Sequence, residues 1–267
     1  MTPLRLLDLF SGIGGFSLGL ERSGAFRTVA FCEIEQFCRE QLAWRWPKVP
    51  RYEDVRSLSG DLLEADGITV EAICGGFPCQ DISCAGKGAG LEGERSGLWF
   101  EYARLIGEIR PLLVVIENVP RIRTLGVDRI LNDLETLGYS CEPLVVGARH
   151  VGAPHRRQRA WLVAYPIGSE LREQLRRRCG SSRQESPLSA NDGAQGAVAD
   201  TDGESLERLA IARLQPHPWH AEPPVGRVVD GLPARLVENE LRAFGNAVVP
   251  QIPEMIGRAI IASMGFI

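Results

Sequence analysis

The sequence predicts an α/β protein: a doubly wound, mostly parallel sheet with a small irregular region attached. Up to about residue 165, apolar strand-like runs alternate with amphipathic helical segments. This alternation is typical of a parallel sheet with helices on both faces. A glycine-rich turn follows the first apolar run, as it does in nucleotide-binding sheets of this class. After Pro166 the composition shifts to Ser, Arg, Gly and Pro with little periodicity, which predicts a small irregular domain or a loop.

Apolar runs and the residues that interrupt them predict the individual elements. The expected strands are short apolar stretches, at Leu4–Phe10, Thr28–Ile34, Val70–Gly75, Leu112–Val119, Pro143–Val146 and Ala160–Tyr165. The expected helices have helical periodicity and several end near proline or glycine; they start near Gly14 and span Gln36–Trp46, Gly97–Ile109, 125–138 and Val248–Ile267. These elements divide the chain into a main domain (1–165), a small irregular region (166–235) and a C-terminal segment that returns to the main domain (236–267).

The charge of the chain is mildly acidic, with a formal net charge of −4 and a sequence pI of about 5.7. This argues weakly against a nucleic-acid partner, which usually requires a basic face. However, residues 143–169 contain four arginines, two histidines and no acid, so a local cationic patch remains compatible with the acidic whole. No apolar run reaches the length of a membrane span, and the first residues lack a signal-peptide pattern. We therefore expect a cytoplasmic protein with no membrane partner.

The cysteines do not predict a metal site or a disulfide framework. There are seven of them, and none forms a Cys-x-x-Cys pair. Cys74, Cys79 and Cys84 are evenly spaced, but structural zinc prefers closer pairs together with histidines. We expect no metal.

The first candidate site is the turn within Leu7–Glu21, where glycines let the backbone approach a ligand closely before a helix begins. Taken alone, this turn is equally compatible with a tight strand-to-helix connection. Glu33 at the end of the next strand can accept hydrogen bonds from ribose hydroxyls. Asp54 can accept a hydrogen bond from an adenine amino group, although taken alone it is more simply interpreted as an ordinary acid in a loop.

A second set of residues predicts covalent chemistry. Cys79 lies on a Gly- and Pro-rich turn directly after an apolar strand, where nearby cations or a helix N-terminus would favour the thiolate. Glu117 ends another apolar strand, where partial burial would raise the pKa of its carboxyl group so that it can share a proton. Arg157 and Arg159 would point to the same face of a strand and offer forked donors to a carbonyl or phosphates; a solvated basic edge strand is the alternative.

In this order, these segments resemble the bacterial and phage DNA (cytosine-5)-methyltransferase family. The resemblance covers residues 4–165 and about 226–262. The motifs that carry it are LDLFSGIGG, FCEIE, YEDV, GGFPCQ, ENVP, the Arg-x-Arg segment and FGNAVVP. It implies that 1–165 is a catalytic and cofactor-binding domain and that 166–235 recognises the DNA target.

The resemblance also implies a mechanism. Cys79 adds to carbon 6 of a cytosine turned out of the duplex, and Glu117 holds the base at N3 and its amino group. Arg159 holds the 2-carbonyl, and Arg157 supports the covalent intermediate. Carbon 5 then takes a methyl group from S-adenosylmethionine. Four further residues are assigned to substrate binding by the same resemblance: Pro78, Gln80, Ser83 and Asn118.

The resemblance implies S-adenosylmethionine as the cofactor and assigns ten residues to it. Phe10, Ser11, Gly12 and Gly14 would surround the methionine part, and Glu33 would bind the ribose. The adenine would contact Asp54 and Val55. The remaining residues would close the pocket: Leu98, Asn246 and Val248.

The chain departs from the family pattern at His155, where glutamine is usual, and at Asp81-Ile82-Ser83, where Pro-Phe-Ser often follows the glutamine. The recognition region is short, and residues 166–225 contain seven arginines against nine acids, so it is not a general phosphate-binding surface. Within it, Trp219 could stack in the space left by the flipped base. A zinc role for the flanking His217 and His220 is less favoured than a plain surface loop.

Three other functions compete with this prediction. An RNA cytosine-5 methyltransferase could use the same domain, and a silent DNA-binding regulator could keep the fold, although such a regulator would be free to lose Cys79, Glu117 and the arginines. A nicotinamide-dependent oxidoreductase fits the glycine turn but leaves Pro78-Cys79-Gln80 without a purpose. The expected partner is double-stranded DNA. A cognate restriction endonuclease is compatible with the family, but not as an obligate subunit.

Overall fold

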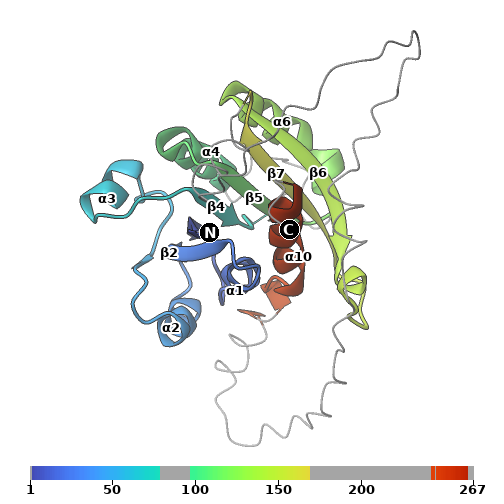
Figure 1. The fold of residues 1–267 in the computed structure, drawn as a ribbon, viewed down its shortest axis with the longest axis horizontal. Helices are drawn as coiled ribbons and strands as arrows, with labels where there is room; N and C mark the ends of the chain where they lie inside the picture. The colour runs from blue at the N-terminus through green and yellow to red at the C-terminus, as the bar shows by residue number, and fades with distance from the viewer. Residues whose placement is uncertain (1, 79–96, 169–241, 244, 264–267) are drawn as a thin grey trace, which may run out of the picture.

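The computed structural model describes residues 2–78, 97–168, 242–243 and 245–263. Seven strands in these residues form one sheet (Figure 1), in the order β3-β2-β1-β4-β5-β7-β6. In chain order the strands are β1 (Leu4–Leu9), β2 (Phe26–Cys32), β3 (Arg51–Tyr52), β4 (Ala72–Gly75), β5 (Leu113–Asn118), β6 (Tyr139–Gly147) and β7 (Gln158–Pro166). The doubly wound, mostly parallel sheet predicted from the sequence is confirmed.

Helices connect most of these strands. They are α1 (Gly15–Arg22), α2 (Gln36–Arg45), α3 (Gly60–Ala65), α4 (Leu98–Ile109), α5 (Ile122–Leu125), α6 (Val127–Thr136), the 3-10 turn η2 (Ala148–Val151) and α10 (Gln251–Ser263). The single helix predicted over 125–138 is wrong at its start, because Gly126 has φ 177° and ψ −1°, outside the helical region, and separates α5 from α6. The C-terminal helix begins after Pro250 rather than at Val248.

Alternate side chains of the central strands pack against opposite layers. In β5, Val114 and Ile116 belong to one apolar cluster, whereas Leu113 and Val115 belong to another. The first cluster includes side chains of α3, α4 and α6, and the second includes side chains of α1 and α10. This two-sided burial explains why the strands are continuously apolar instead of alternating with polar residues.

The sheet reverses its winding at β1. Strands β2 and β4 lie on either side of β1, and both pair with it in parallel. Ligands of doubly wound sheets bind beyond the carboxyl ends of the strands at such a reversal. The turn after β1 and the residues after β4 therefore face the same crevice. Gly75 ends β4, and a side chain there would lie only 2.4 Å from the carbonyl oxygen of Leu9, so glycine lets the two strand ends approach.

The last two strands run against the rest. β7 pairs with both β5 and β6 in antiparallel fashion. As a result, Glu117 near the carboxyl end of β5 lies opposite Trp161, close to the amino end of β7. This places the residues at the start of β7 at the same edge of the sheet as the carboxyl ends of the parallel strands.

The C-terminal segment packs against α1. A side chain at Gly15 would lie 2.5 Å from the carbonyl oxygen of Val248. Gly19, one turn later on the same helix face, is equally crowded by the backbone at Pro250. α10 then lies beside α1 (Figure 1), where Ile252, Met255 and other apolar side chains fill the second cluster. The final helix therefore packs on the α1 side of the sheet.

None of the helices in the described residues is both long and apolar enough to cross a membrane. The predicted division at 165/166 and 235/236 stays a prediction, because residues 169–241 lie outside the described residues.

Candidate active site

The glycine turn between β1 and α1 has three residues in the left-handed region. Phe10 and Gly12 both have φ +52°, and Gly14 has φ +84°. A non-glycine residue in this region is strained, and such strain clusters at functional sites. Ser11 closes the turn, because its Oγ donates to the carbonyl oxygen of Asp8 at 2.6 Å. A side chain at Gly12 would meet no other atom within 4 Å, so its backbone faces open space.

Glu33 connects this turn to the end of β2. The residue lies just beyond the strand, which begins and ends two residues earlier than predicted. Its Oε2 accepts from the Gly12 N–H at 2.7 Å, and its Oε1 accepts from the Glu35 N–H at 2.9 Å. Burial raises the pKa of Glu33, while these N–H groups act to lower it. Each carboxylate oxygen retains a further lone pair, so the group can still accept from vicinal hydroxyls.

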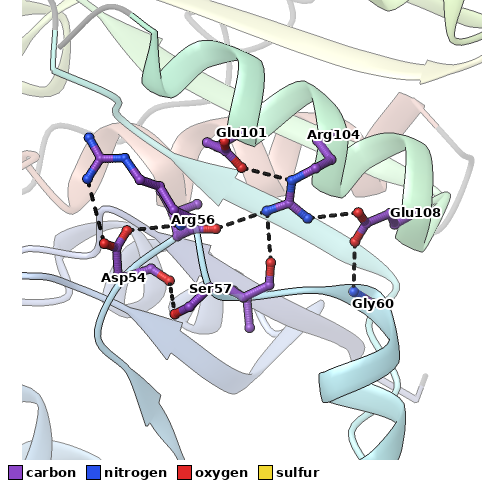
Figure 2. Close-up of polar contacts among 9 residues, drawn as sticks. Asp54, Arg56, Ser57, Gly60, Glu101, Arg104 and Glu108 are labelled. Carbon is purple, nitrogen blue, oxygen red and sulfur yellow. Dashed lines mark hydrogen bonds and ion pairs between the residues drawn. The ribbon is translucent and has the colours of Figure 1, made fainter. Parts of the chain in front are cut away.

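Asp54 and Val55 lie in the connection between β3 and α3, as Figure 2 shows for Asp54. The Oδ1 of Asp54 accepts from the Arg56 N–H at 2.9 Å, and Oδ2 lies 3.6 Å from the Arg56 guanidinium. The side chain of Val55 is buried in the same apolar cluster against which Leu98, the first residue of α4, is packed. Asp54, Val55 and Leu98 thus come from two adjoining segments.

The C-terminal segment packs beside the glycine turn at the start of α1. Val248 is half-buried against α1, whereas Asn246 is exposed. Arg242 forms an ion pair with Glu35 at 3.1 Å, which ties this segment to the residues just after Glu33.

One cavity joins the glycine turn to the basic segment. It has a volume of about 720 Å³ and is lined by side chains and backbone from the turn and α1, from the start of β7 and from the C-terminal segment: Ile13, Gly14, Gly15, Leu18, His155, Arg157, Arg159, Ala247, Val248, Val249 and Pro250. The sequence analysis gave His155 no role, but the histidine lines this cavity.

Glu117 lies against the start of the loop that leads to Cys79. A side chain at Gly76 would meet the Oε2 of Glu117 at 2.6 Å, so it would displace the Glu117 carboxylate from its position. The neighbouring Asn118 is buried and its Nδ2 donates to the Phe77 carbonyl oxygen at 3.2 Å. These contacts fix residues 76 and 77 at the carboxyl end of β5.

Glu117 forms an ion pair with Arg159 of β7, with 2.9 Å between Nε and Oε1. The side chain of Glu117 is 14% exposed and that of Arg159 is 25% exposed. Burial raises the pKa of Glu117 to about 7, although Arg159 and Arg157 both act to lower it. The carboxyl group is therefore able to hold or release a proton near neutral pH.

The expectation that Arg157 and Arg159 share one face of a strand is wrong. β7 begins at Gln158, and Arg157 has φ +27°, so the period-two rule does not apply to it. The Nη2 of Arg157 instead donates to the carbonyl oxygens of Gly245 and Ala247 at 2.8 and 2.7 Å. Both arginines still lie close to Glu117, but Arg157 holds the C-terminal segment.

Three of the predicted residues, Cys79, Gln80 and Ser83, lie outside the described residues, while Pro78 is described and exposed. His217, Trp219 and His220 also lie outside the described residues. Sequence reasoning missed Gly76, although a second glycine directly after a buried strand was a signal of close approach. It also missed Asp8, a buried acid in an apolar strand, whose Oδ2 accepts from the N–H and hydroxyl of Ser17 and thereby caps α1.

The described residues fit a nucleoside cofactor with a short polar tail. Glu33 offers carboxylate acceptors suited to ribose hydroxyls, and the open space at Gly12 lets a ligand approach the backbone. In the part of the chain that the structure describes, no group of three or more His, Cys, Asp or Glu residues could hold a metal ion.

Comparison with known proteins matches the chain to the family model "C-5 cytosine-specific DNA methylase" over residues 4–221. The Type II methyltransferase M1.ScrFI of Lactococcus lactis subsp. cremoris is 34% identical over 60% of this chain and 41% of its own length. M.HhaI of Haemophilus parahaemolyticus is 33% identical over 62% of this chain and 50% of its own length. M.NgoBI of Neisseria gonorrhoeae is 28% identical over 98% of this chain and 82% of its own.

Two solved structures give the same result. A putative DNA modification methyltransferase from an Escherichia coli prophage superposes with a TM-score of 0.53 at 29% identity, over 65% of this chain and 48% of that one. The Entamoeba histolytica methyltransferase EhMeth superposes over 99% of both chains with a TM-score of 0.63, but its 14% identity shows the fold alone.

The chain spans about half the length, or less, of several curated relatives that it matches. The family model nevertheless covers well over half of this chain, and the described residues of the motifs that carried the resemblance lie in one sheet and around one crevice. The chain belongs to the C-5 cytosine-specific DNA methylase family, whose methyl donor is S-adenosylmethionine.

Proposed function

We propose that this chain is a sequence-specific DNA cytosine-5 methyltransferase that acts through a covalent bond between Cys79 and a flipped-out cytosine. The observation that carries the proposal is the ion pair of Glu117 with Arg159 beside Gly76, three residues before Cys79. A carboxyl group and a guanidinium at this place match the two kinds of polar group on one edge of cytosine.

Cytosine carries its 2-carbonyl, N3 and exocyclic amino group on adjacent atoms. Residues that bind these groups must therefore lie side by side, and the 2.9 Å separation of Glu117 and Arg159 meets that requirement. A protonated Glu117 donates to N3, and its other oxygen accepts from the amino group. Arg159 donates to the 2-carbonyl. Since burial raises the pKa of Glu117 to about 7, the proton for N3 is present at neutral pH.

Protonation at N3 draws electrons from the ring and makes carbon 6 electrophilic. The thiolate of Cys79 adds to carbon 6, and the electron pair of the former 5,6 double bond makes carbon 5 nucleophilic. S-adenosylmethionine, when bound, supplies an electrophilic methyl group to this carbon. A base then removes the proton from carbon 5, which restores the double bond and expels Cys79 as thiolate.

The glycine turn and the segments around it would hold the cofactor. Phe10, Ser11, Gly12 and Gly14 are assigned to the methionine part and Glu33 to the ribose. The adenine contacts Asp54 and Val55. The remaining walls come from Leu98, Asn246 and Val248. Two of these residues, Gly14 and Val248, line the cavity that extends to Arg157 and Arg159, which supports a path for the methyl group to the base held by Glu117.

Double-stranded DNA is the proposed substrate, and the target base must leave the stack because its reactive carbons are inaccessible within the duplex. Pro78, Gln80, Ser83 and Asn118 are assigned to the substrate, and residues 166–235 to recognition of the target sequence. The Type II names of the relatives favour a cognate restriction endonuclease as a separate protein.

The proposal is tested with unmethylated DNA, labelled S-adenosylmethionine and three proteins: wild type, Cys79→Ser and Cys141→Ser. Cys141 is a half-buried thiol on β6 and serves as the matched control. Sequencing for 5-methylcytosine is expected to find one short motif methylated by the wild type and the control, and none by Cys79→Ser. If the wild type binds the cofactor but labels no DNA, the proposal fails and RNA becomes the next substrate to test.

A further inference from the structure

A cluster around Arg104 of α4 is not used by the mechanism above. Figure 2 shows the Arg104 guanidinium between helix α4 and the connection from β3 to α3. Nε donates to Glu101 Oε2 at 2.8 Å, and Nη1 donates to Glu108 Oε1 at 2.7 Å. Both acids lie on α4 itself, at i−3 and i+4, so they orient the guanidinium on the helix surface.

The remaining donor of Arg104 leaves its own helix. Nη2 donates to the carbonyl oxygen of Val55 at 3.1 Å and to that of Leu58 at 2.8 Å. The second oxygen of Glu108 accepts from the Gly60 N–H at 2.9 Å. Three backbone groups of one connection are thus tied to two side chains of α4, and we call Arg104 and Glu108 together the α4 clamp.

The connection that the α4 clamp holds also carries Asp54. Inside it, Asp54 accepts hydrogen bonds through its own carbonyl oxygen from the N–H and hydroxyl of Ser57 and from the Leu58 N–H. These bonds make residues 54–58 a compact turn. A shift of its carbonyl groups at 55 and 58 would therefore move the Asp54 carboxylate as well.

The same helix begins with Leu98, which is assigned to the cofactor pocket and packs against the cluster that holds Val55. Leu98 and Arg104 are six residues apart, about 9 Å along the helix axis. Since the α4 clamp ties the helix to the turn, it fixes the distance between the Leu98 wall and the wall formed by Asp54 and Val55. Arg104 itself is not assigned to the pocket, and four of its N–H donors are occupied by protein acceptors.

We propose that Arg104 is a positioning residue for the adenine part of the cofactor, acting through the Val55 and Leu58 carbonyl oxygens. This inference rests on the proposed cofactor site. Arg104 cannot be replaced by lysine without loss, because a single ammonium group cannot bond two acids and two carbonyls in this forked geometry. Glu108→Gln would keep the size of the side chain but only one acceptor oxygen, so the bond to either Arg104 or Gly60 would be lost.

The test measures binding of S-adenosylhomocysteine by calorimetry for wild type, Arg104→Gln, Arg104→Lys, Glu108→Gln and Arg258→Gln. Arg258 forms a similar i−4 ion pair with Glu254 on α10 and is the matched control. We expect Kd to rise on the order of tenfold for Arg104→Gln and less for the two milder variants. Arg258→Gln should keep the wild-type Kd. In turnover, KM for the cofactor should rise while kcat stays within about twofold.

A second ligand separates positioning from general loosening of the fold. S-inosylhomocysteine has a carbonyl at position 6 in place of the adenine amino group and a proton at N1, so position 6 cannot donate to Asp54 and N1 cannot accept. The wild type should prefer S-adenosylhomocysteine, and Arg104→Gln should lose much of that preference, whereas a loss of stability alone would weaken both ligands equally.

The inference is overturned if Arg104→Gln, or the two milder variants should it fail to fold, binds S-adenosylhomocysteine like the wild type. It is equally overturned if the preference for adenine is absent in the wild type or unchanged in the variants. A wild type that binds neither ligand would refute the proposed cofactor site itself, which is a distinguishable result.

Discussion

Glu33 and Glu117 both lie at the carboxyl ends of parallel strands, and burial raises the pKa of both carboxyl groups, yet their partners differ. Glu33 accepts from two backbone N–H groups, those of Gly12 and Glu35. Glu117 faces the guanidinium of Arg159 and the backbone at Gly76. The carboxyl group of Glu33 is thus bonded to the backbone of a turn, whereas that of Glu117 is paired with the side chain of Arg159.

This difference matches two different tasks. Backbone N–H groups fix Glu33 as an acceptor in one position, which suits a group that orients ribose hydroxyls. Burial raises the pKa of Glu117 to about 7, which suits a group that exchanges its proton near neutral pH. Under the proposed function, the cofactor end of the crevice would bind the ligand and the β5–β7 end would handle protons.

The largest effect is expected for Glu117→Gln. The amide can donate a hydrogen bond to N3 but cannot transfer a proton, so kcat should fall on the order of 10²–10⁴-fold. Binding of S-adenosylhomocysteine should stay within about twofold of the wild type, because Glu117 lies at the other end of the crevice. Single-turnover methylation and calorimetry measure the two quantities; weakened cofactor binding together with normal kcat would reverse the assignment.

The pH dependence of kcat/KM should reflect the titration of the Glu117 carboxyl group. Glu117 is protonated below its pKa of about 7 and loses its proton as the pH rises. The kcat/KM for DNA should therefore fall above about pH 7, approaching tenfold per pH unit. This descending limb should persist in Glu33→Gln and disappear from the residual activity of Glu117→Gln. A limb that survives in Glu117→Gln would mean that another group titrates.

Glu33→Gln should weaken cofactor binding, by a smaller factor than the loss of kcat expected for Glu117→Gln. The amide keeps one acceptor but brings an NH2 group towards either Gly12 or Glu35, so the turn loses one of its two hydrogen bonds. We expect Kd for S-adenosylhomocysteine to rise on the order of tenfold, with kcat at saturating cofactor nearly unchanged. An unchanged Kd with a reduced kcat would show that the comparison between the two carboxyl groups is wrong.

The smallest effect is expected for Arg157→Lys, which tests the contact between the segment before β7 and the C-terminal segment. The lysine can reach at most one of the carbonyl oxygens of Gly245 and Ala247 in good geometry. The free energy of unfolding should fall by about 1 kcal/mol, measured by urea denaturation. Arg156→Lys, at an exposed neighbouring position, is the control and should be neutral.

The fold could be predicted from local patterns because each pattern acts over a few residues. The apolar runs that became β1, β4 and β5 are buried on both faces of the sheet, so periodicity and length identified them. The break at Gly126 was missed because a glycine inside a helical pattern is often tolerated. The two-residue strand β3 was missed because Arg51–Tyr52 is too short to show any period.

The site was only partly predictable for a physical reason. Strand ends placed Glu33 and Glu117 at the crevice, since parallel strands end at one edge. The two bonds of Arg157 to residues 245 and 247 join segments 88 and 90 residues apart, and no local pattern encodes such a contact. The bonds of Arg104 to residues 55 and 58 also join distant segments, 49 and 46 residues apart.

The most direct test of the central claim is to trap the bond between Cys79 and cytosine. Long duplex DNA made with 5-fluorocytosine in place of cytosine contains every short motif, and fluorine at carbon 5 cannot leave as the proton does. With S-adenosylmethionine present, the wild type should form a complex that survives denaturation, and peptide mass spectrometry should locate the bond at Cys79. Cys79→Ser should form none. A wild type that binds the cofactor and this DNA but forms no covalent complex would contradict the account.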